Sequence, residues 1–275
     1  MLLVLIDAQR SSSGAIATMT STLMINLTIS DMLFLFYNVT ILLVSFVFED
    51  WQMGFAICVS SQSMSMWTMF CSFYTMVAIS ILRYIAAVHP TCGFSVSRAH
   101  RLVICLATWL MGFAVSIPNW IHQVVVQVEE ANYCMLLMTS QQTFLYFVLF
   151  GGIAFLPFVL LLLVCYFRIV QSLWFSRSMV ARSSAHIQHN QKATVIILIV
   201  LVVFVIMWIP CSVVIFLSAA QSLPQTPGAF IANNLSSVLA YSNCSVSPII
   251  CFSLSEQFQA GLRKLFQRGA GEGPG

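Results

Sequence analysis

Six long apolar stretches dominate the chain, and short polar segments separate them. Each stretch holds at least the about 20 residues that an α-helix needs to cross a bilayer. The stretches are continuous, whereas the strands of a membrane β-barrel alternate apolar and polar residues over about ten positions. We therefore predict six membrane-spanning helices, at about 20–47, 56–84, 102–125, 143–169, 193–219 and 228–254.

The composition agrees with this pattern and excludes several classes of protein. The 275 residues are 60% hydrophobic and only 7% charged, and their mean hydropathy is +0.94. Soluble domains are about 45–50% apolar and about 25% charged. A soluble enzyme and a nucleic-acid-binding protein are therefore excluded. A membrane enzyme has no support either, because no His/Glu or Ser/His pair lies within the spans.

The basic residues set the orientation of the spans. All 11 Lys and Arg residues fall on one side of the predicted helices. The positive-inside rule makes that side cytoplasmic. The charged residues of the opposite loops are all acids, namely Glu49, Asp50, Glu129 and Glu130. This topology places the C-terminus in the cytoplasm.

A short apolar run, residues 1–6, precedes the first predicted span. Six helical residues rise only about 9 Å, so this run cannot cross a core of about 30 Å. We expect it to be the cytoplasmic end of a further helix whose outer part is absent. The alternative is an apolar N-terminus that lies on the membrane.

Two of the nine cysteines, Cys58 and Cys134, face outward on this topology. Thiols in an oxidising compartment are expected to pair, so we predict a disulfide between them. The remaining cysteines show no metal-binding spacing. Four glycosylation-type motifs, at Asn26, Asn38, Asn234 and Asn243, fall inside spans, and we interpret them as chance matches.

Several residues inside the spans suggest chemistry. Asp31 lies in the middle of a span, where a carboxylate costs at least ~2.5–3.5 kcal/mol, so it is a functional candidate by default. The alternative is a structural hydrogen-bond acceptor. Arg83 closes the cytoplasmic end of the helix that Cys58 opens, although an arginine there can simply anchor the helix at the interface. Prolines that kink helices lie within four spans: Pro118, Pro157, Pro210 and Pro248.

Together these residues resemble the rhodopsin-like (class A) G-protein-coupled receptors over nearly the whole chain. The matching points are Asn26-Leu27 with Asp31, Trp51, Cys58 with Arg83-Tyr84, Trp109, Pro157, Phe204 with Trp208-x-Pro210, and Ser247-Pro248 followed by Phe258. A closer similarity to galanin-type peptide receptors and their orphan relatives rests on residues 239–250, 254–258, 226–230 and 95–98.

The resemblance implies an all-α, seven-helix membrane bundle formed by residues 1–268. It also implies a short amphipathic helix at about 256–267 and a flexible tail at 269–275. The implied ligand is an extracellular (neuro)peptide, and the implied partner is a heterotrimeric G protein at the plasma membrane. An amine ligand is disfavoured, because Ser65 stands where amine receptors of this family carry an aspartate.

Three sets of site residues follow from the resemblance. The implied ligand pocket comprises Ser65, Met66, Met69, Trp208, Cys211, Ser212, Ile215, Asn233, Ser237 and Tyr241. The implied sodium site, which is the one cofactor we consider, comprises Asp31, Ser72, Asn243 and Ser247. The implied switch and G-protein-coupling residues are Arg83, Tyr84, Phe204, Trp208, Pro210, Pro248 and Cys251.

The chain also departs from the family pattern. Leu82 replaces the acid that precedes the arginine, and Ser247 and Cys251 replace the asparagine and tyrosine of the last helix. Cys165 stands where the family has a tyrosine, with Tyr166 one place later. We therefore expect a poorly locked resting state. A receptor-like protein that no longer signals remains an alternative, and a six-span transporter or channel is a weaker one.

Overall fold

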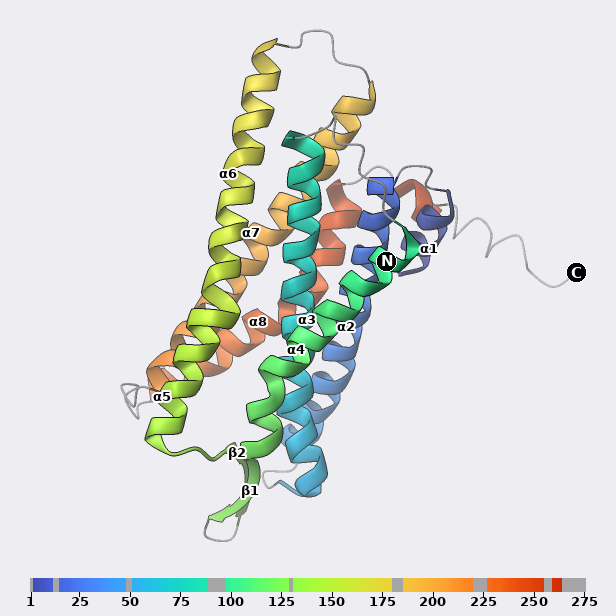
Figure 1. Cartoon of the computed structure of the whole chain (residues 1–275). Helices are drawn as coiled ribbons and strands as arrows, with labels where there is room; N and C mark the ends of the chain where they lie inside the picture. Colours follow the sequence, from blue (N-terminus) through green and yellow to red (C-terminus); the bar gives the residue numbers. More distant parts are fainter. Residues whose placement is uncertain are drawn as a thin grey trace, which may run out of the picture.

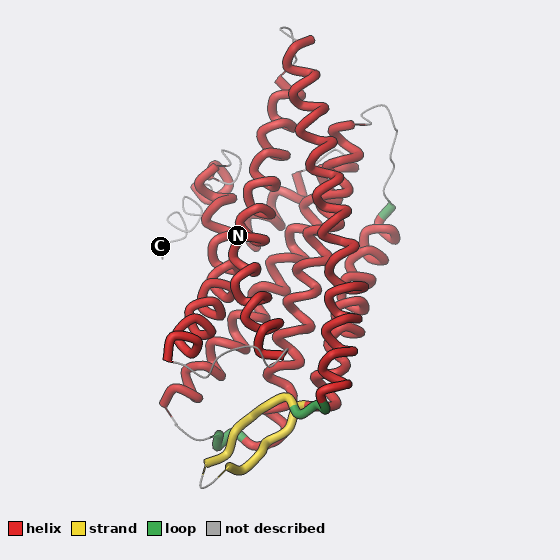
Figure 2. The backbone as a smooth tube through the Cα atoms, turned by 90° about the vertical axis from the view of Figure 1, so that its left-hand side faces the viewer, coloured by secondary structure: helices red, strands yellow, loops and turns green. Residues whose placement is uncertain are grey.

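The protein is described here by a computed structural model that covers residues 2–11, 15–47, 51–88, 97–128, 131–179, 185–219, 227–254 and 259–263. Long helices run side by side in one bundle, and a small hairpin lies at one end (Figures 1 and 2). The elements are α1 Leu2–Ser11, α2 Ala15–Val47, α3 Gly54–Val88, α4 Arg98–His122, β1 Gln123–Val128, β2 Ala131–Leu136, α5 Ser140–Leu149, the π-helix η1 Phe150–Phe155, α6 Leu156–Met179, α7 Ala185–Ala219 and α8 Pro227–Leu254.

The helical bundle confirms the predicted fold class. Five described segments are long and apolar enough to cross a membrane: Ala17–Ile41, Gly54–Val88, Arg98–His122, Gln141–Ser172 and Val195–Val214. The sixth predicted span, 228–254, coincides with α8. In a bilayer the backbone must satisfy its own hydrogen bonds, and this is why long apolar runs become helices.

Helix α3 forms the centre of the bundle. Every side chain from Phe70 to Val77 is buried, so this part of the helix is covered on all sides. Helices α2, α4, α6 and α7 pack around it. A helix that is buried all round belongs in the core of a large bundle. We name the two ends of the bundle after residues of α3: the hairpin end lies near Cys58, and the arginine end lies near Arg83.

Helix α4 is fixed to α3 and α2 by indole hydrogen bonds. Trp67 Nε1 donates to the Trp109 carbonyl at 2.9 Å, and Trp109 Nε1 donates to Asn26 Oδ1 at 2.9 Å. Asn26 Nδ2 in turn donates to Thr75 Oγ1 at 2.8 Å and to Thr108 Oγ1 at 3.2 Å. Asn26 and Trp109 therefore have a structural role among three helices.

The hairpin corrects the sequence prediction for the end of the third span. The span was predicted over 102–125, but α4 ends at His122 and residues 123–125 begin β1. Strands β1 and β2 pair antiparallel, from Gln123 opposite Leu136 to Val128 opposite Ala131. The segment Gln123–Val128 has four valines in six residues, and β-branched side chains favour strands. The predicted outer loop 126–142 is therefore partly a sheet.

The described part of the predicted amphipathic helix at 256–267 is helical over residues 259–263. It lies against α1, because a Cβ added at Gly261 would come within 2.7 Å of Val4 Cγ1. The absence of a side chain at Gly261 thus permits this close contact. The predicted tail 269–275 lies outside the described residues.

Candidate ligand and switch sites

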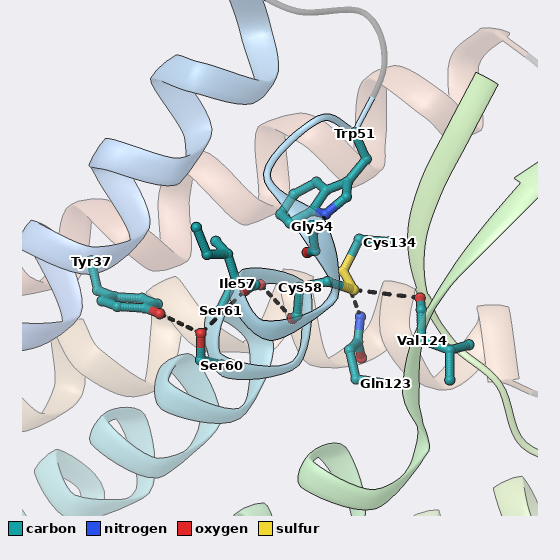
Figure 3. Close-up of a disulfide and its surroundings, with 10 residues drawn as sticks. All are labelled: Tyr37, Trp51, Gly54, Ile57, Cys58, Ser60, Ser61, Gln123, Val124 and Cys134. Carbon is teal, nitrogen blue, oxygen red and sulfur yellow. Dashed lines mark hydrogen bonds between the residues drawn. A yellow bond between two sulfur atoms is a disulfide. The ribbon is translucent and has the colours of Figure 1, made fainter.

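The predicted disulfide is confirmed: Cys58 at the start of α3 is bonded to Cys134 in β2 (Figure 3). The side-chain amide of Gln123 donates to Cys134 Sγ at 3.2 Å, and Cys58 Sγ lies 3.4 Å from the Val124 carbonyl oxygen. Both strands of the hairpin therefore contact the disulfide, which ties the hairpin to the N-terminal end of the central helix α3.

The segment that enters α3 also contacts the hairpin. The backbone N–H of Trp51 donates to the Asn132 carbonyl at 3.0 Å, and Trp51 Nε1 donates to the Gly54 carbonyl at 3.0 Å. Gly54 has φ +78°, a left-handed conformation that favours glycine. Trp51, one of the residues that carry the family resemblance, thus closes the turn beside the disulfide (Figure 3).

Side chains of four helices, α2, α3, α7 and α8, make contacts toward the hairpin end of the bundle. Ser65 hydrogen-bonds to Asn38, which connects α3 with α2. The Cys211 thiol hydrogen-bonds to Ser237, which connects α7 with α8. The rings of Tyr241 and Phe34 contact edge to face at 5.3 Å, which connects α8 with α2. Four residues of the implied pocket therefore lie in interhelical contacts: Ser65, Cys211, Ser237 and Tyr241.

The other residues of the implied pocket differ in how far they are exposed. Met66 and Met69 are half-buried. Ser212 is exposed and donates to the carbonyl of Trp208 in its own helix at 2.9 Å. Trp208 Nε1 is buried and has no hydrogen-bond partner among the described residues. The side chains of Ile215 and Asn233 lie outside the described part of the structure.

Sequence reasoning missed a second contact between α2 and α3 at this end. The Tyr37 hydroxyl hydrogen-bonds to Ser60 Oγ at 2.5 Å (Figure 3). Asn38 also donates to the Phe34 carbonyl at 2.8 Å. The sequence indicated this contact only through the hydroxyl and amide groups near the hairpin-side ends of α2 and α3, within otherwise apolar spans.

Asp31 lies in the centre of the bundle. Its carboxylate accepts a hydrogen bond from Ser72 Oγ at 2.7 Å, and Ser72 Oγ lies 2.8 Å from Ser30 Oγ. The Cys244 thiol of α8 is a further hydrogen-bonding neighbour of the carboxylate. The structure thus brings Asp31 and Ser72 together. Asn243 is buried, and the side chain of Ser247 lies outside the described part.

This donor set fits a hard cation in part. Hard cations prefer oxygen ligands, and the Asp31 carboxylate with the hydroxyls of Ser72 and Ser30 supplies them. The Cys244 thiol is a soft group that sodium does not prefer. Asp31 is also the one acid whose side chain the described residues include, so a cation would neutralise an otherwise uncompensated buried charge.

An aromatic cluster connects the centre with the neighbouring helices. The rings of Trp208 and Phe204 lie 6.1 Å apart. Phe204 stacks on Phe73 of α3 at 6.2 Å, and Phe73 stacks on Phe155 of η1 at 5.2 Å. The implied switch residue Phe204 therefore contacts the core of α3 directly, and Trp208 contacts Phe204. Pro210 and Pro248 lie inside α7 and α8 as predicted, whereas the side chain of Cys251 is outside the described part.

The π-helix η1 is an irregular turn beside the aromatic cluster. The N–H of Leu156 donates to the Gly151 carbonyl, five residues earlier, instead of the carbonyl four residues earlier. The Tyr74 hydroxyl donates to the Ala154 carbonyl at 3.0 Å. Pro157 follows at once and cannot donate a backbone hydrogen bond. A tyrosine of the central helix thus bonds to the irregular turn before the proline.

At the arginine end, Leu82 is buried and Arg83 and Tyr84 are half-buried. Arg83 Nε is buried and has no hydrogen-bond partner among the described residues. The Tyr166 hydroxyl of α6 hydrogen-bonds to Ser80 Oγ of α3 at 2.9 Å. Tyr166, which is displaced by one position relative to the family pattern, is therefore buried and contacts α3 through Ser80.

Comparison with known proteins identifies the family. The family model described as "7 transmembrane receptor (rhodopsin family)" matches residues 2–250. The chain therefore belongs to the rhodopsin family of seven-transmembrane receptors, which are G-protein-coupled signalling receptors and not enzymes. The transporter alternative has no support in these matches.

Receptors named for peptide ligands are among the similar proteins. The chain is 28% identical to the Allatostatin-A receptor of Bombyx mori, over 90% of this chain and 70% of that receptor. It is also 28% identical to Galanin receptor type 1 of Homo sapiens, over 96% of this chain and 76% of that receptor. C-C chemokine receptor type 8 of Homo sapiens is 25% identical, over 91% of this chain and 70% of that receptor.

Proposed function

We propose that this protein is a plasma-membrane receptor for an extracellular peptide of the galanin or allatostatin-A type and that it activates a heterotrimeric G protein. The similarity to receptors named for these two peptides carries the proposal. The hairpin end faces outward and the arginine end faces the cytoplasm, because every Lys and Arg lies on the arginine side of the spans.

The chemistry of the hairpin end favours a peptide over an amine. His122 is the only described His, Lys, Arg, Asp or Glu residue in the outer half of the helices. An ammonium group buried without a carboxylate partner loses several kcal/mol of hydration. Uncharged amide, hydroxyl and thiol groups, such as those of Asn38, Ser65 and Cys211, suit the amides and side chains of a peptide. The outer acids can attract its basic residues.

We also propose that sodium binds at Asp31 and Ser72, with Asn243 and Ser247 as the further ligands. The two described oxygen donors support the site, and the Cys244 thiol and the Ser247 replacement predict low affinity. Sodium would supply a positive charge that compensates the buried carboxylate. Bound there, it would stabilise the arrangement in which α2, α3 and α8 surround Asp31.

The proposal can be tested by measuring G-protein activation in cells that express the chain at a known surface density. Galanin, allatostatin-A and a chemokine ligand serve as probes, and human galanin receptor type 1 serves as the positive control. Arg83→Ala should abolish any response. Arg98→Ala, at an exposed arginine of the same end, is the matched control and should retain it.

The outcomes separate the alternatives. A response to galanin or allatostatin-A that depends on Arg83 supports the proposed function, and a response to the chemokine alone assigns a different ligand class. Surface-expressed protein whose ligand-stimulated and basal signals both equal those of Arg83→Ala, across all G-protein classes, contradicts signalling and favours the receptor-like alternative.

A further inference from the structure

The hydrogen bonds of the hairpin show which backbone groups point toward the partner strand and which point away. Just beyond the two strands, the N–H of Leu137 donates to the His122 carbonyl at 3.0 Å. In an antiparallel pair, opposite residues alternately exchange hydrogen bonds and exchange none. The even-numbered residues of β1 therefore bond to β2. The odd-numbered residues direct their N–H and C=O groups away from β2; they are Gln123, Val125 and Gln127.

The outer edge of β2 is covered by another segment of the chain. The N–H of Trp51 donates to the Asn132 carbonyl at 3.0 Å. Asn132 lies opposite Gln127 in the register, so its carbonyl points away from β1 as the alternation requires. This contact gives the same assignment of edges as the bond between Leu137 and His122, and it places the segment that enters α3 along the edge of β2.

The outer edge of β1 has no such cover among the described residues. The N–H of Gln123 bonds to the Asn119 carbonyl at the end of α4. The outward N–H and C=O groups of Val125 and Gln127 have no hydrogen-bond partner within the described ranges. Gln127 is exposed, and the hairpin extends past the ends of the helices (Figures 1 and 2). This edge is therefore free to pair with another chain.

Strand β1 lacks the features that protect a free edge. Natural edge strands carry lysine, proline or a bulge, which prevent pairing with a further strand. The segment Gln123–Val128 consists of four valines and two glutamines, so it contains neither a charge nor a proline. Its register with β2 runs from 123 to 128 without a bulge. Because valine also favours extended backbone, the sequence and geometry of β1 suit the addition of a strand.

The chemistry of this edge selects an extended peptide as its partner. The edge offers a donor and an acceptor every second residue, and an extended polypeptide has the matching alternation. An amine has no such array. The charged residues of the outer loops are all acids, which favours a partner with basic residues. A second copy of this chain would bring the same acids to the contact, and like charges oppose such pairing.

We propose that the outer edge of β1, at Val125 and Gln127, binds an extended segment of the extracellular peptide as a third strand. This proposal rests on the proposed function and specifies how the receptor holds its ligand. The implied pocket includes no residue of the hairpin, so the edge is a separate contact that uses the main chain of the peptide. One part of the peptide pairs with β1 and another part enters the bundle.

Amide hydrogen exchange of the full chain in lipid nanodiscs tests the edge directly, with residue resolution from fragmentation mass spectrometry. Without peptide, the amides of Val125 and Gln127 should exchange at least about tenfold faster than those of Val124 and Val126, which bond to β2. Galanin and allatostatin-A are then added separately at saturating concentration. Strand addition should slow the exchange of Val125 and Gln127 to the rate of their neighbours.

Proline substitution measures the same contact through affinity. Val125→Pro removes an outward N–H and leaves the bonds to β2 intact, since edge strands accept proline at such positions. It should weaken peptide binding about three- to tenfold, the effect of one net hydrogen bond. Val125→Ala keeps the N–H and should lose less. Leu136→Pro is the matched control, because the N–H of Leu136 lies on the other edge of the hairpin, and it should not weaken binding. Peptide mapping checks that each variant retains the disulfide.

N-methylation of the peptide tests strand addition without changing the receptor. In an added strand, alternate residues of the peptide direct their N–H groups toward β1. Single N-methyl groups should therefore weaken binding at every second position of one short run and much less at the positions between. A helical peptide would not show this period of two, because its N–H groups bond within the helix.

The outcomes separate this proposal from the proposed function. A peptide that signals through Arg83 but leaves Val125 and Gln127 unprotected overturns strand addition and keeps the function, as does an equal loss of affinity in Val125→Pro and Leu136→Pro. Protection of both amides without an Arg83-dependent signal supports strand addition and refutes signalling. Slow exchange of both amides in the peptide-free protein overturns the proposal, because the edge is then already paired; slow exchange that increases with receptor density assigns it to a second copy. Absence of binding by both peptides refutes both proposals.

Discussion

Replacing Gly112 by alanine tests how closely α4 must approach α3. A Cβ at Gly112 would lie 2.8 Å from the Trp67 carbonyl oxygen and 3.0 Å from the Cys71 backbone nitrogen. Side chains do not normally approach this closely, and both contacts are with backbone atoms of the central helix, which cannot rotate away. Alanine therefore forces the two helices apart. Small residues at such interfaces allow membrane helices to pack closely.

The expected cost follows from three effects. Overpacking a tight interior costs about 1–3 kcal/mol. A shift of α4 also stretches the 2.9 Å hydrogen bonds from Trp67 to the Trp109 carbonyl and from Trp109 to Asn26, and such bonds are worth about 0.6 kcal/mol each in a membrane. The higher helix propensity of alanine returns up to about 1 kcal/mol. The net destabilisation is about 1–3 kcal/mol.

Thermal unfolding of the purified protein in detergent measures this effect. A destabilisation of 1 kcal/mol lowers the midpoint by about 2–4 °C for proteins of this size, so Gly112→Ala should unfold several degrees lower than the parent. Gly152→Ala is the matched control, because nothing lies within 4 Å of its added Cβ. If Gly112→Ala unfolds at the same temperature as Gly152→Ala, the close helix contact does not limit stability and the argument is wrong.

Three other predictions use the same preparation. Cys58→Ser and Cys134→Ser should each lower stability by about 2–4 kcal/mol and reduce surface expression equally, because each breaks the disulfide; a Cys105→Ser control should not, and linked peptides should appear only in non-reducing maps of the parent. Sodium, but not potassium, should raise the unfolding midpoint of the parent, and Asp31→Asn should abolish this response; a parent insensitive to sodium would count against the site. Val200→Ile should fill part of the 20 Å³ cavity and stabilise the fold by up to about 0.5 kcal/mol; a lower midpoint would mean that the cavity walls cannot accept a methyl group.

The sequence predicts the helices of this fold well, because lipid leaves long apolar segments few alternatives. The disulfide was also predictable, since the side of the membrane reduced nine cysteines to one outward pair. The hairpin was not predicted, because the apolar residues Val124–Val126 follow the third span after only two polar residues, His122 and Gln123. A short apolar segment does not distinguish a strand from a buried helix end by periodicity. Only its valine content indicated a strand.

Contacts between helices were less predictable than the helices. The proximity of Ser72 to Asp31 was implied by the family resemblance, which placed both in one sodium site. The hydrogen bonds of Asn38 to Ser65 and of Tyr37 to Ser60 were not predicted. They depend on the rotation and height of α2 relative to α3, which hydropathy does not specify. A helix with apolar residues on all faces, such as α7, gives no preferred rotation in the sequence.

The π-helix η1 explains physically why the direction of the Tyr166 side chain cannot be inferred from sequence spacing alone. A single π-turn changes the rotation of every residue that precedes it relative to those that follow, since it adds a residue to the turn. In this protein the turn is held by Tyr74 on one side and is followed by Pro157, and the inward face of α6 begins after it. Two hydrogen bonds thus join α3 to the α5–α6 segment. Tyr74 of α3 bonds to Ala154, which precedes Pro157, and Tyr166, which follows Pro157, bonds to Ser80 of α3. If the π-turn reverted to a regular helix, either Phe155 would leave its stack on Phe73 or Tyr166 would rotate away from Ser80. The aromatic cluster and the contact between Tyr166 and Ser80 therefore both depend on the geometry of this one segment.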